Sequence, residues 1–185
     1  MLHSIDITDY DTLVYPLLAS EAGDWLRADG DEDTESLNAL IKTALSQCEV
    51  WANQDFVAKT YRMELDETAT AGCYGVDRYP FDAITHVKAW IGGVDTTLVA
   101  NTDYYAKQMK WGSEIVIKKT DMVLDERPDA LRITYTTVPN KAAMPLVIGA
   151  MKLIVEKLYD KRAGEKAQYA DTAERMMVGI RMRGV

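Results

Sequence analysis

The residues best suited to bind a metal ion are three aspartates in an acidic stretch near the N-terminus. Asp29, Asp31 and Asp33 alternate in the sequence ADGDED, as carboxylate ligands do at the start of a calcium-binding loop. That loop requires glycine at its sixth position and glutamate at its twelfth, where this chain has Thr34 and Leu40. We therefore interpret the stretch as a solvated linker that caps the following helix.

Catalytic chemistry has few candidate residues in this sequence. The two histidines, His3 and His86, lie in no Cys–His cluster with the spacing of a zinc site. No serine stands in a nucleophile-elbow glycine pattern, and the phosphate-binding patterns GxxxxGK[ST] and GxGxxG are absent from the sequence. Cys48 and Cys73 are too few for a disulfide framework and favour a reduced, cytoplasmic environment. The sequence therefore predicts no catalytic residue, no cofactor and no metal.

Aromatic residues in the middle of the chain could form a platform for a small ligand. They are Trp90, Tyr104, Tyr105 and Trp111. Such side chains combine an apolar body with one polar atom, which also suits packing in a core or between subunits. We favour packing, and assign Trp90 and Trp111 to a contact between subunits.

Composition limits the class of protein. The chain has 185 residues, of which 48% are hydrophobic and 27% charged, as expected for one soluble globular domain. No window approaches the ~20 apolar residues of a membrane span, and the N-terminus lacks the features of a secretory signal. A formal net charge of −8 disfavours a nucleic-acid coat, although it would suit a channel through which DNA must pass without sticking.

Two helices are predicted before the middle of the chain. After an N-terminal arm of residues 1–19, Ser20 is a suitable N-cap for a short helix at residues 20–27. The side chains of that helix expected to face inward are Ala22, Trp25 and Leu26. A longer helix is predicted at residues 34–51, because its apolar residues recur at the i, i+3, i+4 and i+7 positions of one face.

Residues 59–137 form a predicted β-rich insert. Here the apolar period changes to two, as in half-buried strands. The expected strands are Thr60–Asp66, Ile84–Ile91, Thr97–Val99, Tyr104–Gln108, Glu114–Lys118 and Leu131–Thr137, with Glu67–Asp77 as a loop. Together with the helices they predict an α+β fold with an antiparallel β region.

A third predicted helix, residues 145–163, has more apolar surface than a simple surface helix. Pro145 suits its first turn, and Gly164 suits the left-handed position after its last turn. One stripe contains Val147, Met151, Ile154 and Leu158, and an adjacent stripe contains Ile148, Val155 and Tyr159. The two stripes together exceed the ~100° apolar arc of a helix covered on one side. We therefore assign Met151, Val155 and Tyr159 to an interface with a neighbouring subunit.

The last segment, residues 165–185, brings arginines and methionines after an acidic body. Methionine is flexible and adapts to varied partners. Three interpretations stay open here: a helix folded back on the domain, a disordered end, or a docking tail.

The order of the parts from about Ser20 to Gly164 carries a resemblance. The parts are the short helix ending Trp25-Leu26-Arg27, the linker ADGDED, the long amphipathic helix, the strand Thr60–Asp66, the re-entry Tyr79-Pro80, the strand Leu131–Thr137, and the helix from Pro145 that closes with Leu158-Tyr159-Asp160-Lys161-Arg162-Ala163-Gly164. This order resembles the head–tail connector (adaptor) proteins of tailed bacteriophages, which join the portal to the tail.

The resemblance implies one connector domain, residues 20–164, with a helical core and an inserted β-rich region. It also implies a ring of about twelve subunits below the portal, in the virion neck after assembly in the host cytoplasm. Double-stranded DNA would pass through without sequence-specific binding, and a stopper, tail-completion or tail protein would be a further partner. Residues 165–185 would then dock to the portal through Arg175, Met176, Met177, Ile180, Arg181, Met182 and Arg183.

Two alternatives stay open. One is another neck component, such as a stopper or tail-completion protein, although these tend to be smaller and dominated by β structure. The other is a small-ligand-binding α+β domain that uses the four central aromatic residues as its pocket.

Overall fold

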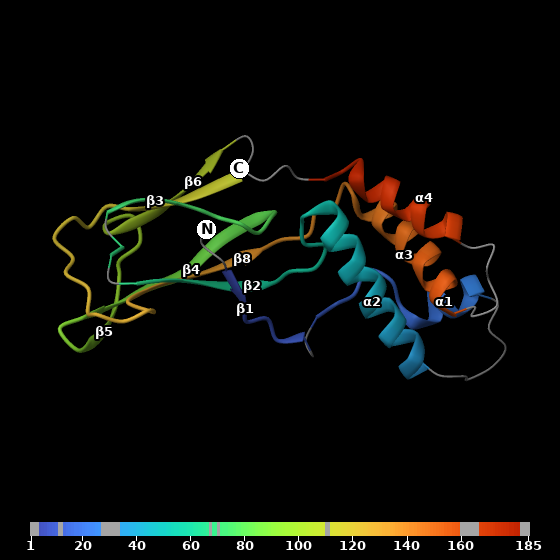
Figure 1. Cartoon of the computed structure of the whole chain (residues 1–185), viewed down its shortest axis with the longest axis horizontal. Helices are drawn as coiled ribbons and strands as arrows, with labels where there is room; N and C mark the ends of the chain where they lie inside the picture. The colour runs from blue at the N-terminus through green and yellow to red at the C-terminus, as the bar shows by residue number, and fades with distance from the viewer. Residues whose placement is uncertain are drawn as a thin grey trace. The chain divides into compact units, whose positions relative to one another are not determined.

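The computed structural model describes residues 4–10, 13–26, 34–66, 68–69, 71–109, 112–159 and 167–181. Within these residues the chain is an α+β protein with a β-rich unit and a helical unit (Figure 1). The β-rich unit contains residues 4–10 and Ala58–Val138, and the helical unit contains Leu13–Val57 and residues 139–181. The predicted fold class is confirmed.

The larger sheet of the β-rich unit is antiparallel and has the strand order β1-β2-β8-β4-β5. Its strands are β1 (Ser4–Asp6), β2 (Thr60–Leu65), β4 (Phe81–Ile91), β5 (Val94–Thr97) and β8 (Leu131–Thr137). A smaller antiparallel sheet has the order β3-β7-β6. Its strands are β3 (Gly72–Gly75), β6 (Tyr104–Met109) and β7 (Gly112–Ile117).

The two central strands of the larger sheet show why this region is folded as β structure. Met63 of β2 pairs with Ile133 of β8, and both side chains are fully buried. The residues next to them on each strand point to the opposite face, because side chains alternate along a strand. Tyr61 and Tyr135 stack with their ring centroids 5.7 Å apart. Residues of both sheets, including Ile115 of β7, form one continuous apolar core.

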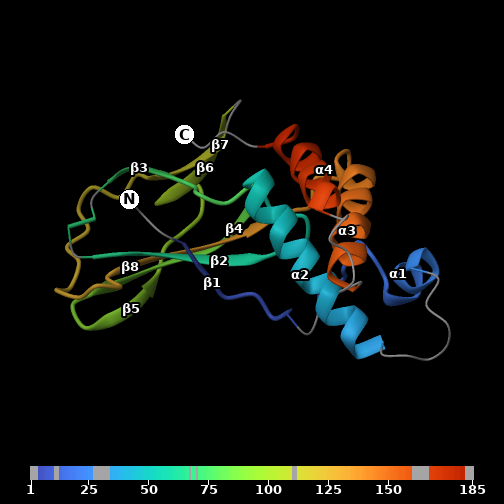
Figure 2. The same ribbon diagram turned by 45° about the vertical axis from the view of Figure 1, so that its right-hand side comes forward.

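The helical unit consists of α1 (Ala19–Leu26), α2 (Thr34–Ala52), α3 (Met144–Tyr159) and α4 (Ala167–Val178). The side chain of Glu21 caps the N-terminus of α1, because its Oε2 accepts a hydrogen bond of 3.0 Å from the Leu18 N–H. The α4 helix packs along α3 and also against α2. The α1 helix contacts α2 and α3 as well, and Figures 1 and 2 both show α3 between α1 and α4.

Two strands were not predicted. Ser4–Asp6, expected to belong to an extended or irregular arm, pairs with β2 as β1. Gly72–Gly75, expected to belong to a loop, pairs with β7 as β3. Both strands are short, and their conformation depends on partners far away in the sequence, so the local pattern gives little signal. The predicted strand Thr97–Val99 was also misplaced, because the strand in this region is Val94–Thr97.

The helix boundaries agree with the prediction within a few residues. The predicted helix ends at residue 27 and at residues 160–164 lie outside the described residues. One inward-facing assignment was wrong: the Trp25 side chain is 49% exposed. The described residues also group differently from the expected arm, domain and tail. Ser4–Asp6 belongs to the β-rich unit, and Ala167–Val178 belongs to the helical unit. These two groupings follow from strand pairing and helix packing respectively.

Candidate interaction surfaces

Trp90 on β4 is covered by two arginines of its own chain. The guanidinium carbons of Arg127 and Arg132 lie 4.1 and 5.5 Å from the centroid of the Trp90 ring. Both distances are within the range of a cation–π interaction. Arg127 donates to Asp129 through two hydrogen bonds of 2.6 and 3.1 Å. Arg132 pairs with Asp95, which stands opposite Trp90 in the sheet. The predicted role of Trp90 in a subunit contact remains a proposal, and its ring already has partners within the chain.

The aromatic platform is not formed among the described residues. Tyr104 is buried in the β core, whereas Tyr105 lies exposed on β6 with the Lys118 ammonium 5.4 Å from its ring centroid. Trp90 is on the opposite face of its strand from the buried Ala89. Trp111 lies outside the described residues. Of the four aromatic residues, the three that the structure describes therefore do not gather around one ligand pocket.

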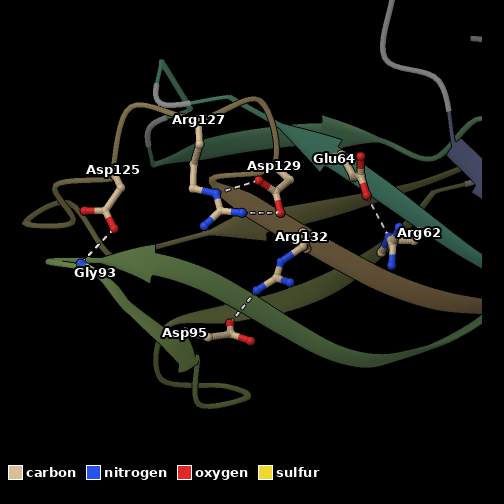
Figure 3. Close-up of polar contacts among 8 residues, drawn as sticks. All are labelled: Arg62, Glu64, Gly93, Asp95, Asp125, Arg127, Asp129 and Arg132. Atoms are coloured by element: carbon tan, nitrogen blue, oxygen red, sulfur yellow. Dashed lines mark hydrogen bonds and ion pairs between the residues drawn. The ribbon is translucent and has the colours of Figure 1, made fainter.

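Charged side chains occupy the face of the larger sheet that carries Trp90. Arg62 Nε lies 2.8 Å from Glu64 Oε1 on β2 (Figure 3). Burial lowers the pKa of His86, and the positive charges of Lys88 and Arg132 lower it further. His86 is therefore neutral at pH 7. Among the described residues, no group of His, Cys, Asp and Glu side chains is arranged to hold a metal ion. The candidate calcium residues Asp29, Asp31 and Asp33, and His3, lie outside the described residues.

A polar cluster fastens the first strand to the β core. Ser4 donates to Asp77 through its N–H at 3.1 Å and through its hydroxyl at 2.5 Å. The Tyr135 hydroxyl lies 2.8 Å from Ser4 Oγ and 3.0 Å from Asp77 Oδ1. Burial alone would raise the pKa of Asp77, but the hydrogen bonds from Ser4 and Tyr135 outweigh it and hold the pKa below its usual value. Burial raises the pKa of Tyr135, so this hydroxyl stays protonated.

The side chains assigned to a subunit interface on α3 separate into two kinds. Met151 and Val155 are completely buried in the helical core, so their assignment to a subunit interface was wrong. The surplus apolar arc is covered by α4, which contributes Ala173 and Met177 to the same core. Tyr159 remains exposed and available to a partner.

None of the described helices combines the length and apolar character needed to cross a membrane.

The side chains assigned to portal contact also divide. Met177 is fully buried, and Met176 and Ile180 pack partly against the core, so these three are not free docking groups. The Gln54 side-chain amide donates to the Ile180 carbonyl at 2.8 Å and fixes the end of α4. Arg175 and Arg181 are exposed. Met182 and Arg183 lie outside the described residues.

A surface on α1 escaped the sequence prediction. The exposed Trp25 donates from Nε1 to Glu156 Oε2 on α3 at 3.2 Å, and the Lys152 ammonium lies 5.3 Å from its ring centroid. These contacts fix the orientation of a large apolar side chain at the surface. The sequence did contain one indication that Trp25 is exposed. Glu21 lies one turn before Trp25 on the same short helix, and Asp24 directly precedes it.

The chain was compared with known proteins. No protein-family model matches it, and no curated protein sequence matches it. It is similar to a chain of the structure "Neck of empty GTA particle computed with C6 symmetry", with a TM-score of 0.70 and 17% identity. It is also similar to chains of "Neck of native GTA particle computed with C12 symmetry" (TM-score 0.67, 16% identity) and "Virion of native gene transfer agent (GTA) particle" (TM-score 0.64, 17% identity). Each comparison covers 100% of this chain and 97% of the other. The chain therefore shares the fold of these proteins over its whole length.

Proposed function

We propose that the chain is a structural head–tail connector in the neck of a phage-like particle. The observation that carries this proposal is the similarity over 100% of this chain and 97% of a chain from a GTA particle neck. Similarity of that extent includes both the β-rich and the helical unit. The described residues also lack a metal cluster and a gathered aromatic pocket, which favours an assembly role over a small-ligand-binding domain.

The connector forms a ring of about twelve copies in this proposal. Neck structures computed with C6 and C12 symmetry support such an arrangement around one axis. In a closed ring each copy meets the next through two different surfaces, so the subunit must carry two complementary faces. The portal lies on one side of the ring, and a stopper, tail-completion or tail protein lies on the other.

Double-stranded DNA passes through the ring without sequence-specific contacts. The formal net charge of −8 supports this role, because an acidic wall repels phosphate groups and avoids the counterion release that drives non-specific binding. The ring is assembled in the host cytoplasm and becomes part of the virion neck. A stopper or tail-completion protein is the alternative within the neck, and it differs from a connector in not touching the portal.

Electron microscopy of the purified chain tests the ring. Negative-stain images should be recorded for the chain alone and for the chain mixed with the portal protein encoded in the same gene cluster. The proposal expects closed rings in the mixed sample, attached to the portal. Rings that form but never attach to the portal would favour the stopper alternative. Monomers in both samples would contradict the proposal.

A further inference from the structure

The exposed face of α1 combines an anchored aromatic side chain with negative charge. Trp25 is 49% exposed, and its contacts with Glu156 and Lys152 hold it in one orientation. Asp24 and Glu21 are exposed beside it, and Asp24 has no ion pair within the described part of the chain. Large aromatic side chains that are already fixed before binding are typical anchors of protein interfaces, because little conformational entropy is lost.

The exposed face of α4 combines an apolar side chain with positive charge. Val178 is 49% exposed at the end of the helix, and the exposed side chains of Arg175 and Glu174 both lie one turn before it. Arg175 and Arg181 together outnumber Glu174, so this end of the helix carries a net positive charge. Arg181 follows in a turn that its N–H closes on the Val178 carbonyl at 3.3 Å. Neither arginine has an acidic partner among the residues that the structure describes. The opposite side of α4 is buried through Ala173 and Met177, so this charged face points away from the core.

These two faces lie on different sides of the helical unit. The α1 and α4 helices each pack against α2 and α3, and α3 lies between them in both views of the ribbon (Figures 1 and 2). The α1 face is net negative although it includes Lys152, the α4 face is net positive although it includes Glu174, and each face has an apolar centre. A subunit with two complementary faces on different sides can bind a second copy head to tail.

We propose that the α1 face of one copy binds the α4 face of the next copy, and this inference rests on the proposed ring. Val178 packs against Trp25, while Arg175 and Arg181 meet Asp24 and Glu21. The guanidinium groups also suit the face of an indole ring. A symmetric pairing of two α1 faces is disfavoured, because it would place carboxylates against carboxylates.

Cross-linking between copies tests this pairing in a chain with the exposed thiol removed by Cys73→Ser. Cys48 is left in place, since it is buried and burial raises the pKa of its thiol to about 12. One version carries Asp24→Cys and a second carries Val178→Cys. The two are mixed before ring assembly and treated with a short bis-maleimide. The pairing predicts a cross-linked dimer in the mixture and almost none when either version assembles alone.

A matched control replaces Asp24→Cys with Asn38→Cys, which places the thiol at an exposed position of α2 in the same unit. This control should give at least tenfold less dimer with Val178→Cys. Rings that form in the mixture without a cross-link, or that cross-link equally in the control, would overturn the pairing and leave the proposed connector function standing. Failure of the unsubstituted chain to form rings with the portal protein would instead overturn the proposed function.

Discussion

Gly149 of α3 faces Met176 of α4 so closely that a Cβ on the glycine would stand 3.2 Å from Met176 Cε. Met176 of α4 therefore packs directly on α3 at Gly149, and α4 covers the surface that the sequence assigned to a subunit interface. Met151 and Val155 are buried as a result. The position of α4 is therefore part of the folded helical unit.

The Gly149 contact predicts a size-dependent effect of substitution. Gly149→Ala should be nearly neutral or stabilising, because Met176 Cε is the movable end of its side chain and alanine gains up to about 1 kcal/mol of helix propensity. Gly149→Leu should destabilise the helical unit by about 1–3 kcal/mol through overpacking. Thermal unfolding followed by circular dichroism measures both. Equal midpoints for the two variants would show that α4 does not pack at this position.

Core and surface residues of α4 should differ in their effect on stability. Met177→Ala should cost about 2–5 kcal/mol, because it leaves a cavity in the helical core. Arg175→Ala should change stability by less than about 0.5 kcal/mol, because its side chain is exposed. Urea unfolding of the two variants makes the comparison. A negligible effect of Met177→Ala is the outcome expected if this segment were a free docking tail.

Asp77 should make the attachment of β1 sensitive to acid. The pKa of its carboxyl is lowered in the folded state, so its contribution to stability is complete above the ordinary aspartate pKa of about 3.9. The contribution is lost as the pH falls through the lower folded-state value. Hydrogen exchange at Ile5 and Ile7, whose N–H groups face β2, should therefore accelerate in acid relative to the rest of the sheet.

Asp77→Asn should accelerate the same exchange at neutral pH, because a charge-assisted hydrogen bond contributes about 1.5–3 kcal/mol. Asp121→Asn is the matched control, since Asp121 is exposed away from the cluster. If the two variants exchange alike at β1, then the Ser4–Asp77–Tyr135 cluster does not fasten the strand.

The contact proposed between copies should respond to charge reversal. Arg175→Glu and Asp24→Arg should each raise the protein concentration needed for ring assembly by about fivefold, because like charges then face each other. Combining the two changes should restore assembly. Lys141→Glu changes the net charge equally at an exposed position before α3 and should have little effect. Additive weakening in the double variant would contradict the direct pairing.

The sequence predicted the elements whose burial pattern repeats over many residues. The α2 helix and the β8 strand are examples, since Ile41, Ala44 and Cys48 recur on one helical face and Leu131, Ile133 and Tyr135 alternate on one strand. Patterns of this length record local periodicity directly. The short strands β1 and β3 have no such pattern, and Ser4 is held by Asp77, 73 residues away in the sequence.

The interaction surfaces were harder to predict, because a sequence does not show which part of a chain covers an apolar face. The wide arc of α3 is compatible with either a neighbouring subunit or a later helix, and the structure shows α4 there. Trp25 was expected inside, whereas Glu156 and Lys152 hold it at the surface from a helix far along the chain. Exposure of a tryptophan depends on such tertiary contacts.

The central claim is that this chain occupies the neck of a particle, and its location can be measured directly. Particles purified from cells that encode the chain should be labelled with a gold-conjugated antibody against it and imaged by electron microscopy. The account predicts label at the junction between head and tail on most particles, and none on particles from a deletion strain. Label on the capsid surface or at the tail tip, or particles that lack the protein, would contradict it.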